Sequence, residues 1–195
     1  METKKFSLVT YLIENEYGKV RGLQERLSEL TGSTKCLTDW QPHITVGDGL
    51  EVTAEQLSEI ENKLQKFAER QQTIVTKITG FGGIDNWKGA VEGKITPYVI
   101  WLDVEVSAEL LKLWTELRDT VTAHYLAWLP RSQNYVPHVT LAFADLTKEG
   151  YEKGMEYLAK ESFESPLTVS HVALVECYGV GNMTSREYKQ FPFLG

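Results

Sequence analysis

PHITV (residues 42–46) and PHVTL (residues 137–141) are two versions of one five-residue pattern, and this pattern decides the fold that we expect. Apolar and polar residues alternate in both stretches, which predicts half-buried strands whose histidine and threonine point to the same face. The two motif histidines, His43 and His138, are half of the four histidines in the 195 residues. Two such strands supply two imidazoles and two hydroxyls.

The segments on either side of the motifs follow the same order in both halves of the chain. Hydrophobic periodicity and turn signals predict strand, helix, strand, helix and strand in each half. The first-half elements are residues 6–13, 17–30, 42–46, 53–69 and 73–79, and the second-half elements are residues 98–104, 107–126, 137–141, 147–160 and 167–176. This match indicates a two-fold internal duplication rather than an array of short repeats. Phe81, Gly82 and Gly83 predict a turn after the fifth element.

The duplication predicts an α+β fold of two similar lobes. Residues 1–95 form the first lobe with the His43-Ile44-Thr45 motif, and residues 96–195 form the second with His138-Val139-Thr140. We expect antiparallel or mixed sheets with helices outside them, because each sheet must bury one apolar face. The lobes together form one compact bilobal domain, and the two motif strands approach one another across a central cleft.

Composition and charge limit the class of partner. The net charge is −7 and the sequence has no block of Lys and Arg, whereas proteins that grip long nucleic acid usually present a basic surface. We therefore expect short RNA ends or small nucleotides as partners, and no long duplex nucleic acid. The N-terminal apolar stretch is too short and too polar for a signal peptide or a membrane span, so we expect no membrane partner. The two distant cysteines predict reduced thiols in a cytoplasmic protein, which we expect to be a monomer.

Paired histidine and threonine side chains suit the cleavage of a phosphodiester without a metal or another cofactor. This reaction needs a base for the attacking hydroxyl or water, an acid for the leaving oxygen, and donors for the phosphoryl oxygens. Histidine can take either proton role near neutral pH, because its unperturbed pKa is about 6.5. Thr45 and Thr140 each lie two residues after a histidine, so their hydroxyls can donate to phosphoryl oxygens from the same strand face.

The paired Pro-His-[Ile/Val]-Thr-[Val/Leu] frames in a duplicated α+β chain resemble the two-histidine (2H) phosphoesterase superfamily. That group includes 2′-5′ RNA ligase-like proteins and RNA 2′,3′-cyclic phosphodiesterases. The resemblance implies a bilobal fold with a central cleft and metal-independent phosphodiester chemistry. It also implies catalytic roles for His43 and His138 and phosphate binding by Thr45 and Thr140.

Three further pairs of residues hold corresponding positions in the two halves as candidate substrate-binding residues. They are Trp40 with Tyr135, Lys35 with Arg131, and Phe81 with Tyr178. The first pair can stack on a base or belong to the core, and the basic pair can contact phosphate or be solvated. The last pair can line the cleft or pack in the core. For the remaining histidines, His124 and His171, we expect packing or surface roles.

We therefore predict a phosphodiesterase that acts on 2′,3′-cyclic phosphates or 2′-5′ linkages, as a hydrolase or as a reversible ligase. Three alternatives remain open at this point: a nucleotide-binding module of the same fold without turnover, an interaction scaffold, and a metal-dependent hydrolase that uses the motif histidines with Asp39, Asp48 or Asp145. The sequence does not identify which histidine is the base.

Overall fold

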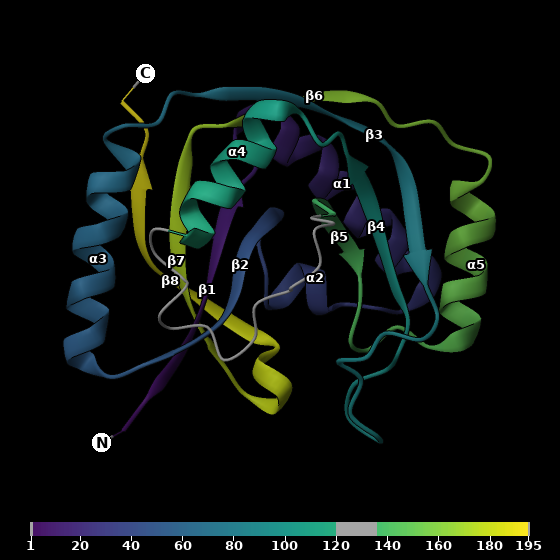
Figure 1. Ribbon diagram of the computed structural model, residues 1–195. Helices are drawn as coiled ribbons and strands as arrows, with labels where there is room; N and C mark the ends of the chain where they lie inside the picture. Colours follow the sequence, from purple (N-terminus) through teal and green to yellow (C-terminus); the bar gives the residue numbers. More distant parts are fainter. Residues whose placement is uncertain (1, 120–135, 195) are drawn as a thin grey trace.

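In the part of the chain that the structure describes, one eight-stranded antiparallel sheet has the order β6-β3-β4-β5-β2-β1-β7-β8 (Figure 1). The computed structural model describes residues 2–119 and 136–194. The strands are β1 (Lys4–Tyr11), β2 (His43–Val52), β3 (Ile74–Ile84), β4 (Val99–Val104), β5 (His138–Ala142), β6 (Ser165–Val169), β7 (His171–Tyr178) and β8 (Thr184–Pro192). The helices are α1 (Glu14–Thr31), α2 (Lys35–Thr38), α3 (Ala54–Ala68), α4 (Ala108–Leu117), α5 (Lys148–Leu158) and the short 3₁₀ helix η2 (Val180–Asn182). The predicted α+β class is confirmed.

The two halves of the sequence exchange strands within this sheet. β3, the last strand of the first repeat, pairs with β4 and β6 of the second half, and β7 pairs with β1 of the first half. Strand pairing therefore crosses the sequence boundary near residue 95, and the division into lobes at that residue stays a prediction. The exchange leaves β2 and β5 side by side at the centre of the sheet (Figure 1).

The helices cover one face of the sheet and leave the opposite face to the motif side chains. The core joins the apolar sides of α1, α3, α4 and α5 to inward residues of the strands, among them the fully buried Leu8, Ile44, Leu102 and Val139. α3 and α5 lie at the two outer flanks of the sheet (Figure 1). Because side chains alternate along a strand, the residues next to Ile44 and Val139 point away from this core.

Hydroxyl side chains cap α3 and α5 at corresponding places in the two repeats, and a third one caps α4. The Thr53 backbone N–H donates to Gln56 Oε1 at 2.9 Å, and the Gln56 N–H donates to Thr53 Oγ1 at 3.4 Å, which completes a capping box. Thr147 caps α5 at the corresponding position, and Ser107 caps α4. α4 ends at Leu117, and the part of the predicted helix beyond residue 119 lies outside the described residues.

The structure corrects the predicted strands in three places. The predicted strand 167–176 is in fact two strands that are separated at Ser170. The sequence did not indicate the break, because both strands are apolar and no turn signal lies between them. The predicted turn at Phe81, Gly82 and Gly83 is the second half of β3, paired with β4. β8 was not predicted, because it is an edge strand with mostly exposed polar side chains and lacks an apolar alternation.

Two findings bear on the environment that we expected for the protein. Cys36 and Cys177 are both buried free thiols, as predicted. Within residues 2–119 and 136–194, every helix is too short or too polar to cross a membrane.

Candidate active site

The two motifs meet at the centre of the sheet. β2 and β5 pair antiparallel with Ile44 opposite Val139, so the register places His43 opposite Thr140 and Thr45 opposite His138. Ile44 and Val139 are fully buried on the helix side, whereas the four motif side chains are half-buried on the other side. His43 and His138 are thus diagonal neighbours on one face. The Cα atoms of such diagonal pairs on antiparallel strands lie about 7–8 Å apart.

The strands outside this pair extend the same face in both directions. On β1, Tyr11 lies opposite His43. On β4, Trp101 lies opposite Thr140 and Asp103 lies opposite His138. The face therefore carries imidazoles and hydroxyls at its centre, an aromatic side chain beyond one histidine, and an indole with a carboxylate beyond the other.

Both motif histidines are oriented by the same backbone contact. His43 Nδ1 lies 2.7 Å from the Gln41 carbonyl oxygen, and His138 Nδ1 lies 3.0 Å from the Val136 carbonyl oxygen. A carbonyl only accepts, so Nδ1 carries the proton in each ring and Nε2 keeps its lone pair when the ring is neutral. The accepting carbonyl belongs to the residue before the motif proline, which favours extended backbone at that point. Each Nε2 can therefore accept a proton, or donate one once the ring is charged.

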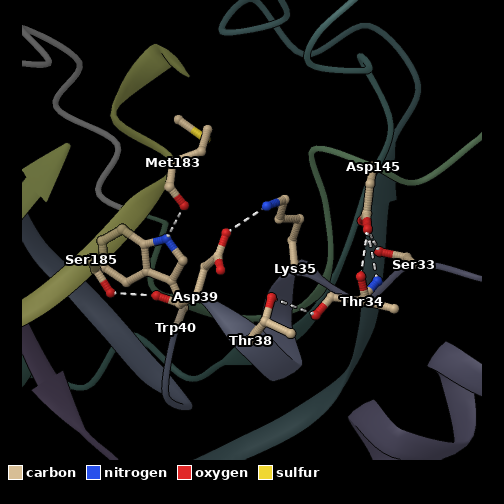
Figure 2. Close-up of polar contacts among 9 residues, drawn as sticks. All are labelled: Ser33, Thr34, Lys35, Thr38, Asp39, Trp40, Asp145, Met183 and Ser185. Atoms are coloured by element: carbon tan, nitrogen blue, oxygen red, sulfur yellow. Dashed lines mark hydrogen bonds and ion pairs between the residues drawn. The ribbon is translucent and has the colours of Figure 1, made fainter. Parts of the chain in front are cut away.

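Aromatic rings surround His43. The Trp40 indole stacks on its imidazole at 4.8 Å between ring centroids and 30° between planes, and the Tyr11 ring meets it edge-on at 6.5 Å. The Trp40 Nε1–H donates to the Met183 carbonyl at 2.9 Å (Figure 2). The pKa of His43 is lowered to about 4, mainly by burial; the Gln41 carbonyl opposes this shift and the nearby His138 adds to it.

His138 has a different neighbourhood. The Trp101 indole lies 5.6 Å from its imidazole at an interplanar angle of 50°. The Trp101 Nε1–H donates to Asp103 Oδ1 at 2.8 Å, so a carboxylate lies on the same sheet face as the histidine. Trp101 and Asp103 were not predicted as site residues. They lie two positions apart on one strand, so the sequence indicates that they share a face. Only the pairing of β4 with β5 shows that this face is the one that carries His138.

The segment before the first motif is tied to distant parts of the chain (Figure 2). Asp145 accepts hydrogen bonds from Ser33 Oγ at 2.6 Å and from the Thr34 backbone N–H at 2.8 Å. The Asp39 carbonyl accepts from Ser185 Oγ at 2.6 Å. These contacts, together with that of Trp40, fix the loop that brings the indole onto His43.

The other predicted substrate-binding residues have varied placements. Lys35 forms an ion pair with Asp39 at 2.7 Å inside this segment, and that hydrogen bond raises the pKa of Lys35 (Figure 2). Phe81 packs against Phe163 at 6.3 Å on the helix side of the sheet, away from the motif face. Tyr178 is 48% exposed at the end of β7. Arg131 and Tyr135, like His124, lie outside the described residues.

His171 has the packing role that we expected. Its side chain is buried, its Nε2 accepts the Tyr11 backbone N–H at 3.2 Å, and its ring stacks on the Tyr11 ring at 6.1 Å. This contact requires a neutral ring, and burial lowers the pKa of His171 accordingly. His171 thereby supports the aromatic ring that meets His43.

The carboxylates considered for a metal site have other partners. Asp39 pairs with Lys35, Asp48 Oδ1 accepts from Ser7 Oγ at 2.7 Å, and Asp145 caps the segment at Ser33. Within the part of the chain that the structure describes, no three His, Cys, Asp or Glu side chains are grouped so that they could hold a metal ion.

Comparison with known proteins identifies the family. Residues 23–180 match the 2′-5′ RNA ligase superfamily. The chain belongs to this superfamily. The resemblance drawn from the two motifs is confirmed, since this is the group of the two-histidine phosphoesterases.

Individual relatives agree with this membership. The chain is 28% identical over 132 residues to a protein of Thermotoga maritima called RNA 2′,3′-cyclic phosphodiesterase, a match over 68% of this chain and 65% of that one, just under two thirds of the relative's length. Escherichia coli LigT, solved with 3′-AMP, superposes with a TM-score of 0.65 at 14% identity over the whole of both chains. A structure from Thermus thermophilus gives a TM-score of 0.64 at 16% identity over 97% of both chains. At such identities the two structures establish a shared fold.

Proposed function

We propose that this protein is a metal-independent phosphodiesterase that acts on RNA ends or small nucleotides carrying a 2′,3′-cyclic phosphate or a 2′-5′ linkage. One observation carries the proposal. The pairing of Ile44 with Val139 brings two imidazoles with the same Nδ1 contact and two threonines to one sheet face. The name of the Thermotoga relative supports the substrate class, as do LigT structures with 3′-AMP, ATP and NADP⁺.

For a 2′,3′-cyclic phosphate, the proposed reaction is hydrolysis by a water molecule. One histidine takes a proton from the water through Nε2 as the water oxygen bonds to phosphorus. The bond from phosphorus to one ribose oxygen breaks, and the other histidine protonates that oxygen. The product is a phosphomonoester with a free vicinal hydroxyl. Thr45 and Thr140 donate to the non-bridging oxygens while charge moves through them.

For a 2′-5′ linkage, the vicinal 3′-hydroxyl replaces water as the nucleophile. One histidine takes the hydroxyl proton, the bond from phosphorus to the 5′ oxygen breaks, and the other histidine protonates that oxygen. The product is a cyclic phosphate, and ligation is the reverse of this step. DNA lacks one of the two vicinal hydroxyls and is therefore inert.

The negative net charge favours small ligands over long nucleic acid. A chain with a charge of −7 gains little from the counterion release that drives binding to long duplexes. We therefore propose that a local pocket recognises an RNA end or a nucleotide, and that the protein works as a monomer in the cytoplasm.

The test is a substrate screen in the presence of excess chelator. The panel contains 2′,3′-cyclic nucleotides, 2′-5′ oligoadenylates, matched 3′-5′ oligonucleotides and DNA controls, with products identified by chromatography and ³¹P NMR. We expect turnover that withstands the chelator and disappears in the double variant His43→Ala, His138→Ala. Activity that the chelator abolishes would instead favour a metal-dependent hydrolase. Calorimetric binding without product would favour a nucleotide-binding module.

A further inference from the structure

A glycine in β3 makes room for the indole that lies beside His138. Gly82 and Trp101 are direct partners in the pairing of β3 with β4. A Cβ atom on Gly82 would lie 2.6 Å from Trp101 Cε2 and 2.9 Å from Cζ2, both well inside van der Waals contact. The indole therefore packs closely against the backbone of β3 at Gly82. Any other residue at position 82 would displace it.

A carboxylate holds the same edge of the indole that faces Gly82. Trp101 Nε1 donates to Asp103 Oδ1 at 2.8 Å, and Asp103 lies opposite His138 on β5. Trp101 itself lies opposite Thr140 and places its ring 5.6 Å from the His138 imidazole. The ring is thus fixed by a steric contact on one strand and a hydrogen bond on its own strand.

His43 has a comparable arrangement built from unrelated parts of the chain. Trp40 stacks on that imidazole, and its Nε1–H is held by the Met183 carbonyl. In both cases an indole whose N–H is already bonded packs on a motif histidine. Because Trp40 precedes its histidine by three residues and Trp101 lies on a different strand, the duplication does not explain the similarity.

We propose that Trp101 is a positioning residue for His138, and that Gly82 and Asp103 hold its indole in place. The Val136 carbonyl holds the imidazole at Nδ1 alone, and the indole beside the ring keeps it in the orientation that preserves this contact. Nε2 is thereby aimed at the face that it shares with His43. The kinetic test of this inference rests on the proposed function. If the protein is a phosphodiesterase, a displacement of His138 by about 1 Å can cost about 10²-fold in rate.

The first test moves the indole without altering any functional group. Gly82→Ala should lower kcat about tenfold to a hundredfold and leave KM within about threefold, because the displaced ring no longer restrains His138. Gly83→Ala is the matched control. It adds a Cβ in the same strand that faces Met155 and Tyr151 on the helix side, so it should leave kcat unchanged. Equal losses of kcat in the two variants would overturn the proposal.

A double variant separates positioning from general damage to the strand. Alanine at position 101 removes the indole atoms Nε1, Cε2 and Cζ2 that the new Cβ would meet. Gly82→Ala should therefore cost much less kcat in a Trp101→Ala background than in the wild type, and the two changes should be non-additive. Strictly additive losses would contradict the proposal.

The role of Asp103 is tested by a conservative pair of variants. Asp103→Asn keeps an oxygen that accepts the indole N–H, whereas Asp103→Ala removes it. We expect Asp103→Asn to keep kcat within about threefold of the wild type and Asp103→Ala to lose about tenfold. Equal losses in both variants would show that the charge matters rather than the hydrogen bond, and would overturn the holding role.

An NMR readout keeps this inference distinct from the proposed function. Long-range ¹H–¹⁵N spectra of the wild type should show His138 in one tautomer with the proton on Nδ1, and Gly82→Ala should show a mixture while Gly83→Ala does not. If the wild type cleaves no phosphodiester, the proposed function fails while the NMR result still decides whether Trp101 orients His138. An unchanged tautomer in Gly82→Ala would refute the positioning role.

Discussion

His43 and His138 hold equivalent places in the repeat, yet their surroundings differ. Both rings direct Nδ1 to the carbonyl two residues before them, because each motif provides the same proline and the same extended backbone. Around His43 the walls are aromatic and burial depresses the pKa to about 4. Around His138 one wall is an indole tied to a carboxylate. Duplication thus sets the orientation of the rings, whereas the neighbouring strands set their environment.

The largest expected effect comes from removing either ring. His43→Ala and His138→Ala should each lower kcat on a 2′,3′-cyclic nucleotide by about 10²–10⁴-fold, since in the proposed mechanism each ring supplies one of the two proton transfers. Steady-state kinetics measures the loss, and circular dichroism with thermal unfolding controls for folding. If one single variant kept full activity, the two rings would not share one reaction.

The motif threonines should follow in size. Thr45→Val and Thr140→Val keep the shape of the side chain but remove the donor, and each should lower kcat about 10²-fold. Thr→Ser at the same positions keeps a hydroxyl and should retain most of the activity. Equal losses for Val and Ser would point to packing rather than to phosphate binding.

Trp40→Ala should remove part of the aromatic environment that sets His43 apart. Burial is the largest cause of the low pKa of His43, so exposure of the ring to water should raise that pKa from about 4 toward its ordinary 6.5. An NMR titration of the imidazole ¹³C–¹H signals measures the shift. Trp101→Ala serves as the control and should leave the His43 titration nearly unchanged. A His43 pKa that stays near 4 in Trp40→Ala would contradict the role given to the stacked indole.

The same pKa predicts how stability depends on pH. Between the ordinary value of 6.5 and the folded value of about 4, the unfolded chain binds a proton at His43 that the folded chain does not. The contribution of His43 is therefore complete above about pH 6.5 and is lost as the pH falls toward 4. In the wild type, this proton should lower the free energy of unfolding by no more than about 3 kcal/mol between pH 6.5 and pH 4, and His43→Gln should abolish this part of the decrease. Urea unfolding at several pH values measures it, with His171→Gln as a comparison, because its lowered pKa acts in the same direction.

The smallest expected effect concerns Lys35. Its ion pair with Asp39 is partly exposed, so Lys35→Met should change the free energy of unfolding by about 1 kcal/mol or less. An unchanged KM would assign Lys35 to the segment that holds Trp40. A several-fold rise in KM with kcat unchanged would instead assign it to phosphate binding.

Much of the fold follows from local signals in the sequence. The capping box at Thr53 and the alternation around Ile44 and Val139 produce a helix and strands where periodicity predicts them. The exchange of β3 and β7 between the halves was not predicted, because strand partners are chosen by contacts far apart in the sequence. The break at Ser170 was not predicted either. The strands on both sides of it are largely apolar and buried, and no turn signal separates them in the sequence.

In the candidate site, too, the sequence predicted the residues that belong to a local motif and missed those that only strand pairing brings near. His43, Thr45, His138 and Thr140 are visible as a repeated pattern, and the register of β2 with β5 brings them together. Trp101 and Asp103 carry no motif of their own and join the site through the pairing of β4 with β5. Phe81 holds a position that looked equivalent to that of Tyr178, but strand alternation turns it toward the helices.

The central claim is that two imidazoles from the two halves act on one phosphate. A crystal structure of the protein with bound 3′-AMP tests it most directly. We expect phosphoryl oxygens within hydrogen-bond distance, about 2.6–3.2 Å, of Nε2 of His43 and of His138 at the same time. A phosphate that contacts only one of these rings, or that binds away from the face shared by β2 and β5, would contradict the claim.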